Sequence, residues 1–356
     1  MVQFHRFQAS YLHAATRQLL MALETPRHIA DDVAEILIHA NLTGHDSHGV
    51  IRLPAYLRAI EAGQLKPAAE PTVLEETSTT VRIDGNHGFG HYTARKGMAL
   101  GIKKAKEANI CAVSFSNTGH IGRVGHYAED AARAGCIGMI TVGLGDLSRG
   151  YVVPHGGIRG AMSTNPIAVG VPTGDEVPFI LDFATSVVAE GKIQVARSKN
   201  LDVPAGYILD NEGVPTVKTS DFYNGGFLLP VGKHKGYALA LMCCLLGGLS
   251  GGFNPEAGSV KGEFMQVWNI EAFMPLTDYQ RGVRAFLDQV KTIPPAPDIE
   301  EVLVPGDVEH QSRVKNLREG IEVPETVYQQ MQEWADRLNI SIEPSVVDEQ
   351  DQARYA

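Results

Sequence analysis

The stretch NLTGHDSHGVIRLPAYL, residues 41–57, contains the side chains of this sequence with the clearest potential for chemistry. If a helix begins near Ser47, His48 and Arg52 lie one turn apart on one face. A guanidinium can hold a carboxylate through two parallel hydrogen bonds, while a histidine nearby moves a proton to or from an oxygen on the adjacent carbon. A 2-hydroxy or 2-oxo acid has both features. In the structural alternative, Ser47 caps the helix, His48 lies on its surface, and Arg52 pairs with Glu61 or another acid.

Two other segments place polar residues where a strand ends. In SNTGHIGRVGHYAED, a loop carrying His120 connects a strand to a helix, and such a loop can turn backbone N–H groups toward an anion or cofactor phosphate. The alternative is an ordinary loop histidine. In PFILDFATS an apolar, strand-like run ends at Asp182, which predicts either a partner for a histidine or ribose hydroxyl, or a cap for a helix over 184–196.

Three glycine- or lysine-containing motifs were compared with known site patterns. GKHKGYALAL starts a helix with Lys233 and Lys235, where a phosphate could bind, although a solvated basic loop fits equally. The Rossmann fingerprint G-x-G-x-x-G is absent, because Ser148 follows Gly143 and Gly145 at the third position. The hydrolase pattern G-x-S-x-G at Ser250 follows a buried helix rather than a strand, so a serine hydrolase is only a distant alternative.

Composition narrows the possible partners and compartments. The 356 residues are 44% hydrophobic and carry a net charge of −10, which argues against nucleic acid as a partner and is compatible with a small anionic ligand. Four cysteines without metal spacing are too few for a disulfide framework, so we expect a reducing cytoplasm and no metal. Without a leader pattern or an apolar run of about 18 residues, we expect no membrane insertion.

The elements that position these motifs follow from the hydrophobic periodicity. Helical spacing fills the first 65 or so residues, alternating strands and helices follow from Pro71, and helical spacing returns over 311–338. Pro294–Pro297 is a plausible linker. We therefore expect three segments, of which the first and last pack together as one helical domain around a central α/β domain: 1–70, 71–293 and 294–356.

Seven segments in order resemble the malate/L-lactate dehydrogenase family, and within it the broad hydroxycarboxylate dehydrogenases. They are GHDSHGVIRLPAYL, NTGHIGRVGHYAEDAARAG, STNPIAVGVP, LDFATS, VPAGYILDNEGVPT, HKGYALALMCCLLGG and LVPGD. The resemblance implies the non-Rossmann, sulfolactate-dehydrogenase-like α/β fold with a central mixed sheet. It also implies an NAD- or NADP-dependent oxidoreductase acting on a small 2-hydroxy or 2-oxo acid, with a cyclic imino-acid reductase as the alternative.

The resemblance also implies residue roles. It makes His48, His120 and Asp182 catalytic and gives Ser47 and Arg52 to the substrate carboxylate. In the implied mechanism, hydride passes between C4 of the nicotinamide and C2 of the substrate, His48 supplies the proton, and Asp182 orients the histidine and raises its pKa. The implied cofactor site consists of His48, Gly122, Arg123, Asp182, Phe183, Ala184, His234, Lys235, Asn269, Pro305, Gly306 and Asp307.

Three further expectations concern the choice of cofactor, the contacts of residues 143–145 and the oligomeric state. NAD is favoured over NADP, although Arg197 and Lys199 are available for a 2′-phosphate. Many family members carry Thr-Asn-Ser where this sequence has Gly143-Leu144-Gly145, so contacts there are open. The resemblance further implies a homodimer whose active sites lie near the subunit contact.

Overall fold

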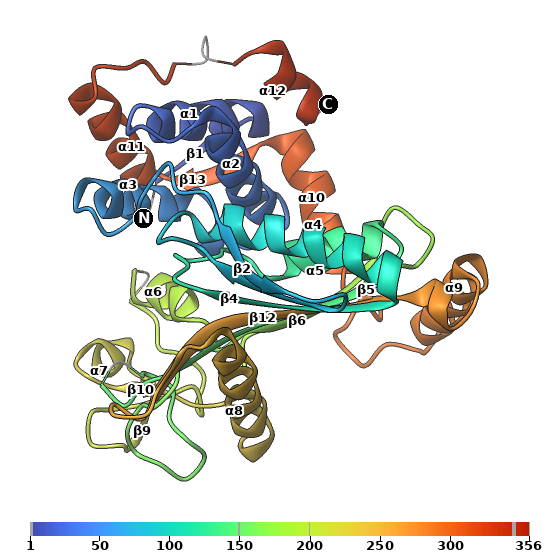
Figure 1. Ribbon diagram of the computed structural model, residues 1–356. Coiled ribbons are helices and arrows are strands. Elements are labelled where there is room, and N and C mark those ends of the chain that lie inside the picture. The colour runs from blue at the N-terminus through green and yellow to red at the C-terminus, as the bar shows by residue number, and fades with distance from the viewer. Residues whose placement is uncertain (1–2, 149, 199, 344–346, 356) are drawn as a thin grey trace.

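The two ends of the chain form one helical layer in the computed structural model, which describes residues 3–148, 150–198, 200–343 and 347–355. Figure 1 shows this layer above the sheet. Leu12, Leu37 and Trp334 share its core with other buried residues from both ends. Its helices are α1 (Ala9–Met21), α2 (Arg27–Leu42), α3 (Leu53–Glu61), α10 (Asp307–Glu319), α11 (Glu325–Arg337) and α12 (Glu349–Arg354).

Two contacts tie the ends together. Strand β1 (Phe4–Phe7) pairs antiparallel with β13 (Ile321–Pro324), so a strand interrupts the helical segment expected over 311–338. Arg17 of α1 is buried and donates to both carboxylate oxygens of Asp351 at 2.5 and 2.9 Å. Since an unpaired buried charge is costly, this ion pair holds α12 against α1.

A mixed sheet forms the centre of the molecule. Its order is β2–β3–β4–β12–β5–β6–β7, with β11 pairing with β12; β3 and β4 run parallel, and the other neighbours run antiparallel. Its strands are β2 (Thr72–Glu76), β3 (Thr80–Asp84), β4 (Ile110–Ser116), β5 (Cys136–Gly145), β6 (Ile167–Val171), β7 (Phe179–Phe183), β11 (Phe253–Asn254) and β12 (Ser259–Asn269).

Helices cover both faces of this sheet. Helices α4 (Gly90–Ala108) and α5 (Gly125–Arg133) lie on the face toward the helical layer, and α8 (His234–Gly247) lies on the other (Figure 1). Alternate residues of β4, such as Val113 and Phe115, bury their side chains against α4 and α5. The expected non-Rossmann α/β fold, with a mixed sheet and a helical part built from both chain ends, is confirmed.

The remaining elements form small units around the sheet. Helix α9 projects from one side of the molecule, on the right in Figure 1. Among the described residues, no helix combines the length and apolar character needed to cross a bilayer. These elements are η1 (Asp46–His48), η2 (Val50–Arg52), α6 (Glu190–Ser198), β8 (Ile208–Leu209), β9 (Pro215–Thr216), α7 (Thr219–Tyr223), β10 (Phe227–Leu228), η3 (Gly248–Ser250), η4 (Ile270–Ala272) and α9 (Leu276–Lys291).

Candidate active site

Two short 3₁₀ turns, η1 and η2, carry His48 and Arg52. The expected single helix from Ser47 is therefore wrong: Gly49 between the turns has extended backbone, with φ −88° and ψ −153°. The buried side chain of Asn41 bridges the turns, since its amide donates to Asp46 at 2.7 Å and its oxygen accepts from the Val50 N–H at 2.9 Å. Asn41 therefore joins the turn that carries His48 to the turn that carries Arg52.

Gly49 cannot be replaced without moving this bridge. A Cβ at position 49 would lie 2.1 Å from the Asn41 side-chain oxygen, closer than atoms approach without bonding. The glycine is therefore required by close packing rather than by an unusual φ angle. Its position between the two turns makes the placement of His48 and Arg52 depend on Asn41.

Hydrogen bonds orient the functional groups of these turns. Ser47 Oγ lies 3.0 Å from His48 Nδ1, and Arg52 Nε donates to the Ser47 carbonyl at 2.6 Å. The expected alternative pairing of Arg52 with Glu61 does not occur, because Glu61 pairs with Arg337. Among the described residues no carboxylate pairs with Arg52, so its terminal nitrogens remain available to a ligand carboxylate.

Three histidines and a tyrosine from separate elements meet beside η1; we call them the histidine cluster. His48 stacks on His120 of the loop after β4, with ring centroids 5.6 Å apart and planes 17° apart. His91, in the first turn of α4, lies 5.9 Å from His120 edge-on. Tyr56 of α3 places its hydroxyl 2.7 Å from His120 Nδ1 and 3.4 Å from His91 Nε2.

All three imidazoles of the cluster favour the neutral form. Burial lowers the pKa of His48 to about 4, and repulsion from nearby Arg52 contributes. Burial also lowers the pKa of His91 to about 3 and depresses the pKa of His120, whose neighbours His91 and His48 add repulsion. The residue His120 still has an exposed surface, as a group lining a cleft would. The expectation of a histidine pKa raised by Asp182 is therefore wrong.

Asp182 has a different role from the one expected. Its Oδ2 accepts from Arg123 Nε at 3.1 Å and from the Gly125 N–H at 2.9 Å. It thus pairs with a buried arginine and caps the start of α5, rather than orienting a histidine or capping a helix over 184–196. Arg123 Nη1 reaches Thr43 Oγ1 at 3.2 Å, which connects the pair to the end of α2.

The start of α8 lies beside the segment that follows β7. The backbone N–H of Val231 donates to the Thr185 carbonyl at 2.9 Å, so the segment before His234 and Lys235 runs along the segment that follows Phe183 and Ala184. His234 and Lys235 are exposed at the first turn of this helix. Exposed N–H groups at a helix start favour an anionic ligand.

The segment Pro305–Asp307 lies beside the start of β7. The Pro305 carbonyl accepts from the Ile180 N–H at 3.2 Å. Gly306 has φ +107°, and a Cβ there would lie 2.6 Å from the Pro178 carbonyl oxygen, so only glycine allows this approach. The segment before His234 and the segment Pro305–Asp307 therefore bond to β7 or to the residues that follow it.

Helix α6 contacts the turn η1 that carries His48. A Cβ at Gly191, in α6, would lie 2.9 Å from the Ser47 Cβ, so the start of α6 packs directly on η1. Figure 1 shows α3 and α6 on the same side of the molecule. The substrate-binding candidate Ser47 therefore lies against α6, the helix that follows β7 in the chain.

Asn269 does not lie level with Asp182 and Phe183 in the sheet. It ends β12, where it pairs with Cys136 at the start of β5, and its side chain caps η4. Asp182 and Phe183 pair instead with Ala168 and Ile167, at the level of Thr141 near the middle of β5. The prediction that Asn269 approaches the cofactor is therefore not supported within one chain.

Ser250 and Arg197, which the sequence also singled out, both make contacts within the protein. Ser250 is buried and donates to the Gly247 carbonyl at 2.8 Å, without a described histidine or carboxylate beside its hydroxyl, which argues against the hydrolase reading. The guanidinium of Arg197 stacks over the Tyr223 ring at 4.3 Å. Lys199, the other candidate for a 2′-phosphate, lies outside the described residues.

Arg123 provides an observation that fits a nicotinamide cofactor. Its Nη2 atom is buried and has no hydrogen-bond partner among the described residues, next to the pair that Asp182 forms. A buried guanidinium nitrogen without an acceptor is costly, and a ligand oxygen or amide carbonyl would satisfy it. The residues present are therefore compatible with a polar ligand group beside β7 and the start of α5.

Tyr56, His91 and Asn41 were not identified from the sequence. Helical spacing places Tyr56 on the apolar face of its helix, and no motif in the sequence gives His91 or Asn41 a role. One signal was available: His91 shares a helix face with Ala94 and Met98, and a histidine on an apolar face needs a partner. The partner, Tyr56, lies 35 positions away in the chain and could not be located from the sequence.

Comparison with known proteins identifies the family. The model of the malate/L-lactate dehydrogenase family matches residues 7–332. Malate dehydrogenase of Pyrococcus horikoshii is 36% identical over 338 residues, covering 91% of this chain and 92% of the relative. Hydroxycarboxylate dehydrogenase B of Escherichia coli K12 is 36% identical over 327 residues, covering 89% and 90%.

Solved structures agree with this result. Sulfolactate dehydrogenase from Methanocaldococcus jannaschii superposes with a TM-score of 0.87 at 31% identity, covering 95% of this chain and 99% of that one. Delta1-piperideine-2-carboxylate reductase from Pseudomonas syringae superposes with a TM-score of 0.80 at 27% identity, covering 93% and 100%. The chain belongs to the malate/L-lactate dehydrogenase family, and the relatives named above are dehydrogenases of malate and of hydroxycarboxylates.

Proposed function

We propose that this member of the family is an NAD(P)-dependent 2-hydroxycarboxylate dehydrogenase that interconverts a small 2-hydroxy acid and its 2-oxo acid. The observation that carries the proposal is that Asn41 bonds to both of the turns that carry His48 and Arg52. A proton-transfer group and a carboxylate-binding group thereby sit on adjacent turns beside a cluster of neutral histidines. That combination fits the two neighbouring oxygen functions of the substrate.

The proposed roles follow from the contacts. Arg52 holds the substrate carboxylate with its terminal nitrogens, while its Nε stays fixed on the Ser47 carbonyl. His48 exchanges the proton of the substrate's C2 oxygen. In the free protein the neutral His48 is ready to accept a proton, as oxidation requires. A bound carboxylate would offset the charge of Arg52, one cause of the low His48 pKa, and so raise its proton affinity for reduction.

A nicotinamide cofactor would supply or accept the hydride. We place it along the segments that meet at β7: Asp182–Ala184, His234–Lys235 and Pro305–Asp307, with Gly122 and Arg123 on the loop before α5. Arg123 and Asp182 hold each other in position, and the free Nη2 of Arg123 offers one hydrogen bond. The choice between NAD and NADP is part of the proposal, with NAD preferred because Arg197 is engaged with Tyr223.

A cyclic imino-acid reductase is the second candidate. The structural similarity to delta1-piperideine-2-carboxylate reductase favours it, because that protein shares the fold over 93% of this chain. A cyclic imino acid also carries a carboxylate for Arg52 and an atom that takes up a proton during reduction. The two candidates differ in the group at C2, so substrate choice separates them.

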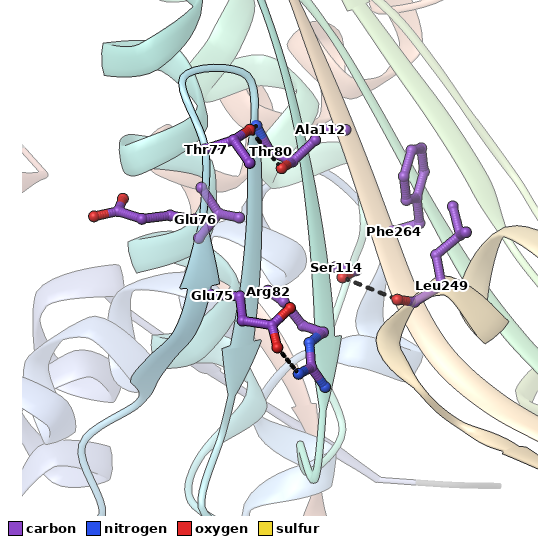
Figure 2. A pocket seen from close by; sticks show the side chains of 10 residues that line it. Glu75, Glu76, Thr77, Thr80, Arg82, Ala112, Ser114, Leu249 and Phe264 are labelled. Carbon is purple, nitrogen blue, oxygen red and sulfur yellow. Dashed lines mark hydrogen bonds and ion pairs between the residues drawn. The ribbon is translucent and has the colours of Figure 1, made fainter.

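We further propose a cytoplasmic homodimer. Helix α8 exposes Leu241 and Leu245, η3 exposes Leu249 four residues further on, and Phe253 follows them. Figure 2 shows the adjoining groove, which Leu249 and Phe264 help to line and in which Ser114 donates to the Leu249 carbonyl. Its volume is about 500 Å³. The residues that line this groove include no histidine, so we assign it to assembly rather than catalysis. A second copy could cover this face with the same face of its own.

The decisive experiment is a panel of 2-oxo acids and cyclic imino acids with NADH and NADPH, followed by the absorbance of the reduced nicotinamide. We expect turnover with at least one small 2-oxo acid. Turnover with cyclic imino acids alone would favour the second candidate. Hydrolysis of an ester with labelling of Ser250 by a phosphonate would overturn both.

A further inference from the structure

The nitrogen Nδ1 of His120 faces two hydrogen-bond partners from different elements. The Gly122 N–H points to it at 3.3 Å, and the Tyr56 hydroxyl lies 2.7 Å away. A backbone N–H can only donate, so Nδ1 must offer a lone pair. The proton of a neutral His120 is therefore on Nε2, which has no partner among the described residues and belongs to a residue with exposed surface.

The same constraint fixes the next two groups. Because His120 Nδ1 has a lone pair, the Tyr56 hydroxyl donates to it. The oxygen of Tyr56 can then accept from His91 Nε2 at 3.4 Å, which places the His91 proton on Nε2. His91 Nδ1, which is buried without a partner, then carries no proton that would need an acceptor. The backbone N–H of Gly122 thus sets the direction of both hydrogen bonds, from His91 to Tyr56 and from Tyr56 to His120.

We propose that Tyr56 and His91 are positioning residues that hold His120 neutral with its proton on Nε2, so that His120 donates a hydrogen bond to the substrate's C2 oxygen while His48 exchanges the proton. The division of roles rests on the proposed function, whereas the tautomer follows from the contacts alone. A His120 imidazolium would need to place an N–H against the Gly122 N–H, which is repulsive. Such a histidine polarises a carbonyl but is a poor acid or base.

The charged and titratable groups around His120 also favour its neutral form. His48 stacks on one side, His91 lies edge-on, and Arg52 is the nearest cation that affects it. Tyr56 is fully buried, and burial raises its pKa above the ordinary value, so its hydroxyl keeps the proton that it donates. No carboxylate among the described residues bonds to the ring and would favour a charged His120.

The test is a direct reading of the tautomer by NMR. Long-range ¹H–¹⁵N correlation spectra of the full-length protein labelled with ¹⁵N-histidine separate protonated from unprotonated ring nitrogens, and His120→Gln identifies the His120 signals. We expect a neutral ring with the proton on Nε2 throughout about pH 5 to 8, the range in which an ordinary histidine titrates. A proton on Nδ1, or titration of His120 within that range, would overturn the proposal.

The variant Tyr56→Phe tests the positioning role. We expect the Nδ1–H tautomer or the charged form of His120 to become populated, KM for the 2-oxo acid to rise about tenfold, the effect of one ordinary hydrogen bond, and kcat to change little. Tyr11→Phe is the matched control, because the Tyr11 hydroxyl contacts only that of Tyr328, at 3.4 Å in the helical layer. An unchanged His120 spectrum in Tyr56→Phe would contradict the role of Tyr56.

The two proposals can fail separately. The spectra of the unmodified protein need no substrate, so they decide the tautomer even if Tyr56→Phe does not fold. If no 2-oxo acid or imino acid in the panel reacts while His120 keeps its proton on Nε2, the proposed reaction fails and the tautomer stands. If turnover occurs and His120 titrates as an ordinary histidine, the reaction stands and the role of Tyr56 fails.

Discussion

The rings of His48 and His120 stack with 5.6 Å between centroids and only 17° between planes. Two imidazoles in this arrangement cannot both carry a positive charge without strong repulsion, so they must divide their roles. The hydrogen bonds that reach His120 Nδ1 favour a fixed donor there. His48, whose Nδ1 contacts the adaptable Ser47 hydroxyl, can take or release a proton by reorienting that hydroxyl.

Replacing each histidine in turn separates these roles. His48→Gln should lower kcat by roughly 10² to 10⁴, the usual effect of losing a general acid or base, with little change in cofactor affinity. His120→Gln should mainly raise KM for the substrate. Steady-state kinetics and cofactor titration measure both. If His120→Gln abolishes turnover while His48→Gln retains kcat, the proton belongs to His120.

The carboxylate grip can be tested at Arg52. A lysine keeps the charge but cannot make two parallel hydrogen bonds, and it would also lose the bond to the Ser47 carbonyl. Arg52→Lys should therefore raise KM by roughly 10- to 100-fold, the effect of losing a hydrogen bond to a charged group, and change kcat less. Arg58→Lys, on the exposed face of α3, is the control. Equal KM values for the two variants would exclude the grip.

The sequence predicted what local patterns determine. The helical spacing of both chain ends, the strand–helix alternation in the middle and the absence of a Rossmann fingerprint all led to the observed class of fold. The pairing of β1 with β13 was missed, because each strand has only four residues and the partners are more than 300 positions apart. Such a pair gains stability from tertiary context rather than from its own pattern.

The candidate site was predicted in part. Ser47, His48 and Arg52 are close in the chain, so their proximity needed no knowledge of the fold, although the helix assumed for them does not form. Asp182 was identified, but its partner Arg123 lies on a different element, and the sequence offered no reason to prefer it over a histidine. Tyr56 and His91 show the limit most clearly, since their meeting depends on how α3 packs against α4.

The depressed histidine pKa values predict how stability depends on pH. His39 and His91 are buried with pKa values of about 4 and 3, so between about pH 6.5 and 4 the unfolded chain binds protons that the folded protein refuses. Stability is therefore lost as pH falls through this range. Asp130 and Glu263, whose pKa values burial raises to about 7, act in the opposite direction, but the depressed histidines, which also include His48, His120 and His126, outnumber them.

Urea unfolding at pH 7.5 and pH 5 measures this effect. The free energy of unfolding should be lower at pH 5, and His91→Gln should reduce the difference by about 1 to 2 kcal/mol, the share of one strongly shifted histidine. His28→Gln, which changes an exposed histidine paired with Glu70, is the control. Equal or greater stability at pH 5 would show that the buried histidines accept protons without unfolding.

The exposed leucines of α8 and η3, Leu241, Leu245 and Leu249, predict the interface of the proposed dimer. Leu245, 63% exposed at the centre of these three, would be covered by a second copy in the proposed dimer. Leu245→Lys should convert the dimer to a monomer in light scattering, because a desolvated lysine without a partner is costly. Val314→Lys, at an exposed position of α10, should leave the mass unchanged. A fully active monomer of the unmodified protein would remove the claim.

The packing of Gly49 against Asn41 predicts a change that affects activity more than stability. In Gly49→Ala the new Cβ would displace the Asn41 side chain, which holds Asp46 on one turn and the Val50 N–H on the other. Both turns should shift, and because a displacement of about 1 Å can cost roughly 10²-fold in rate, kcat/KM should fall by about that factor. Overpacking of this kind costs about 1 to 3 kcal/mol in unfolding free energy.

Two companion variants show whether the clash is the cause. Gly282→Ala, where a Cβ on α9 would meet nothing within 4 Å, should leave activity unchanged and raise the free energy of unfolding by at most about 1 kcal/mol, because alanine favours a helix over glycine. In the double variant Gly49→Ala/Asn41→Ala the clash is gone but so is the bridge, so stability should recover in part while kcat/KM stays low. Recovery of full activity in the double variant would mean that Asn41 does not position His48 and Arg52, and that only the collision with it had disturbed them.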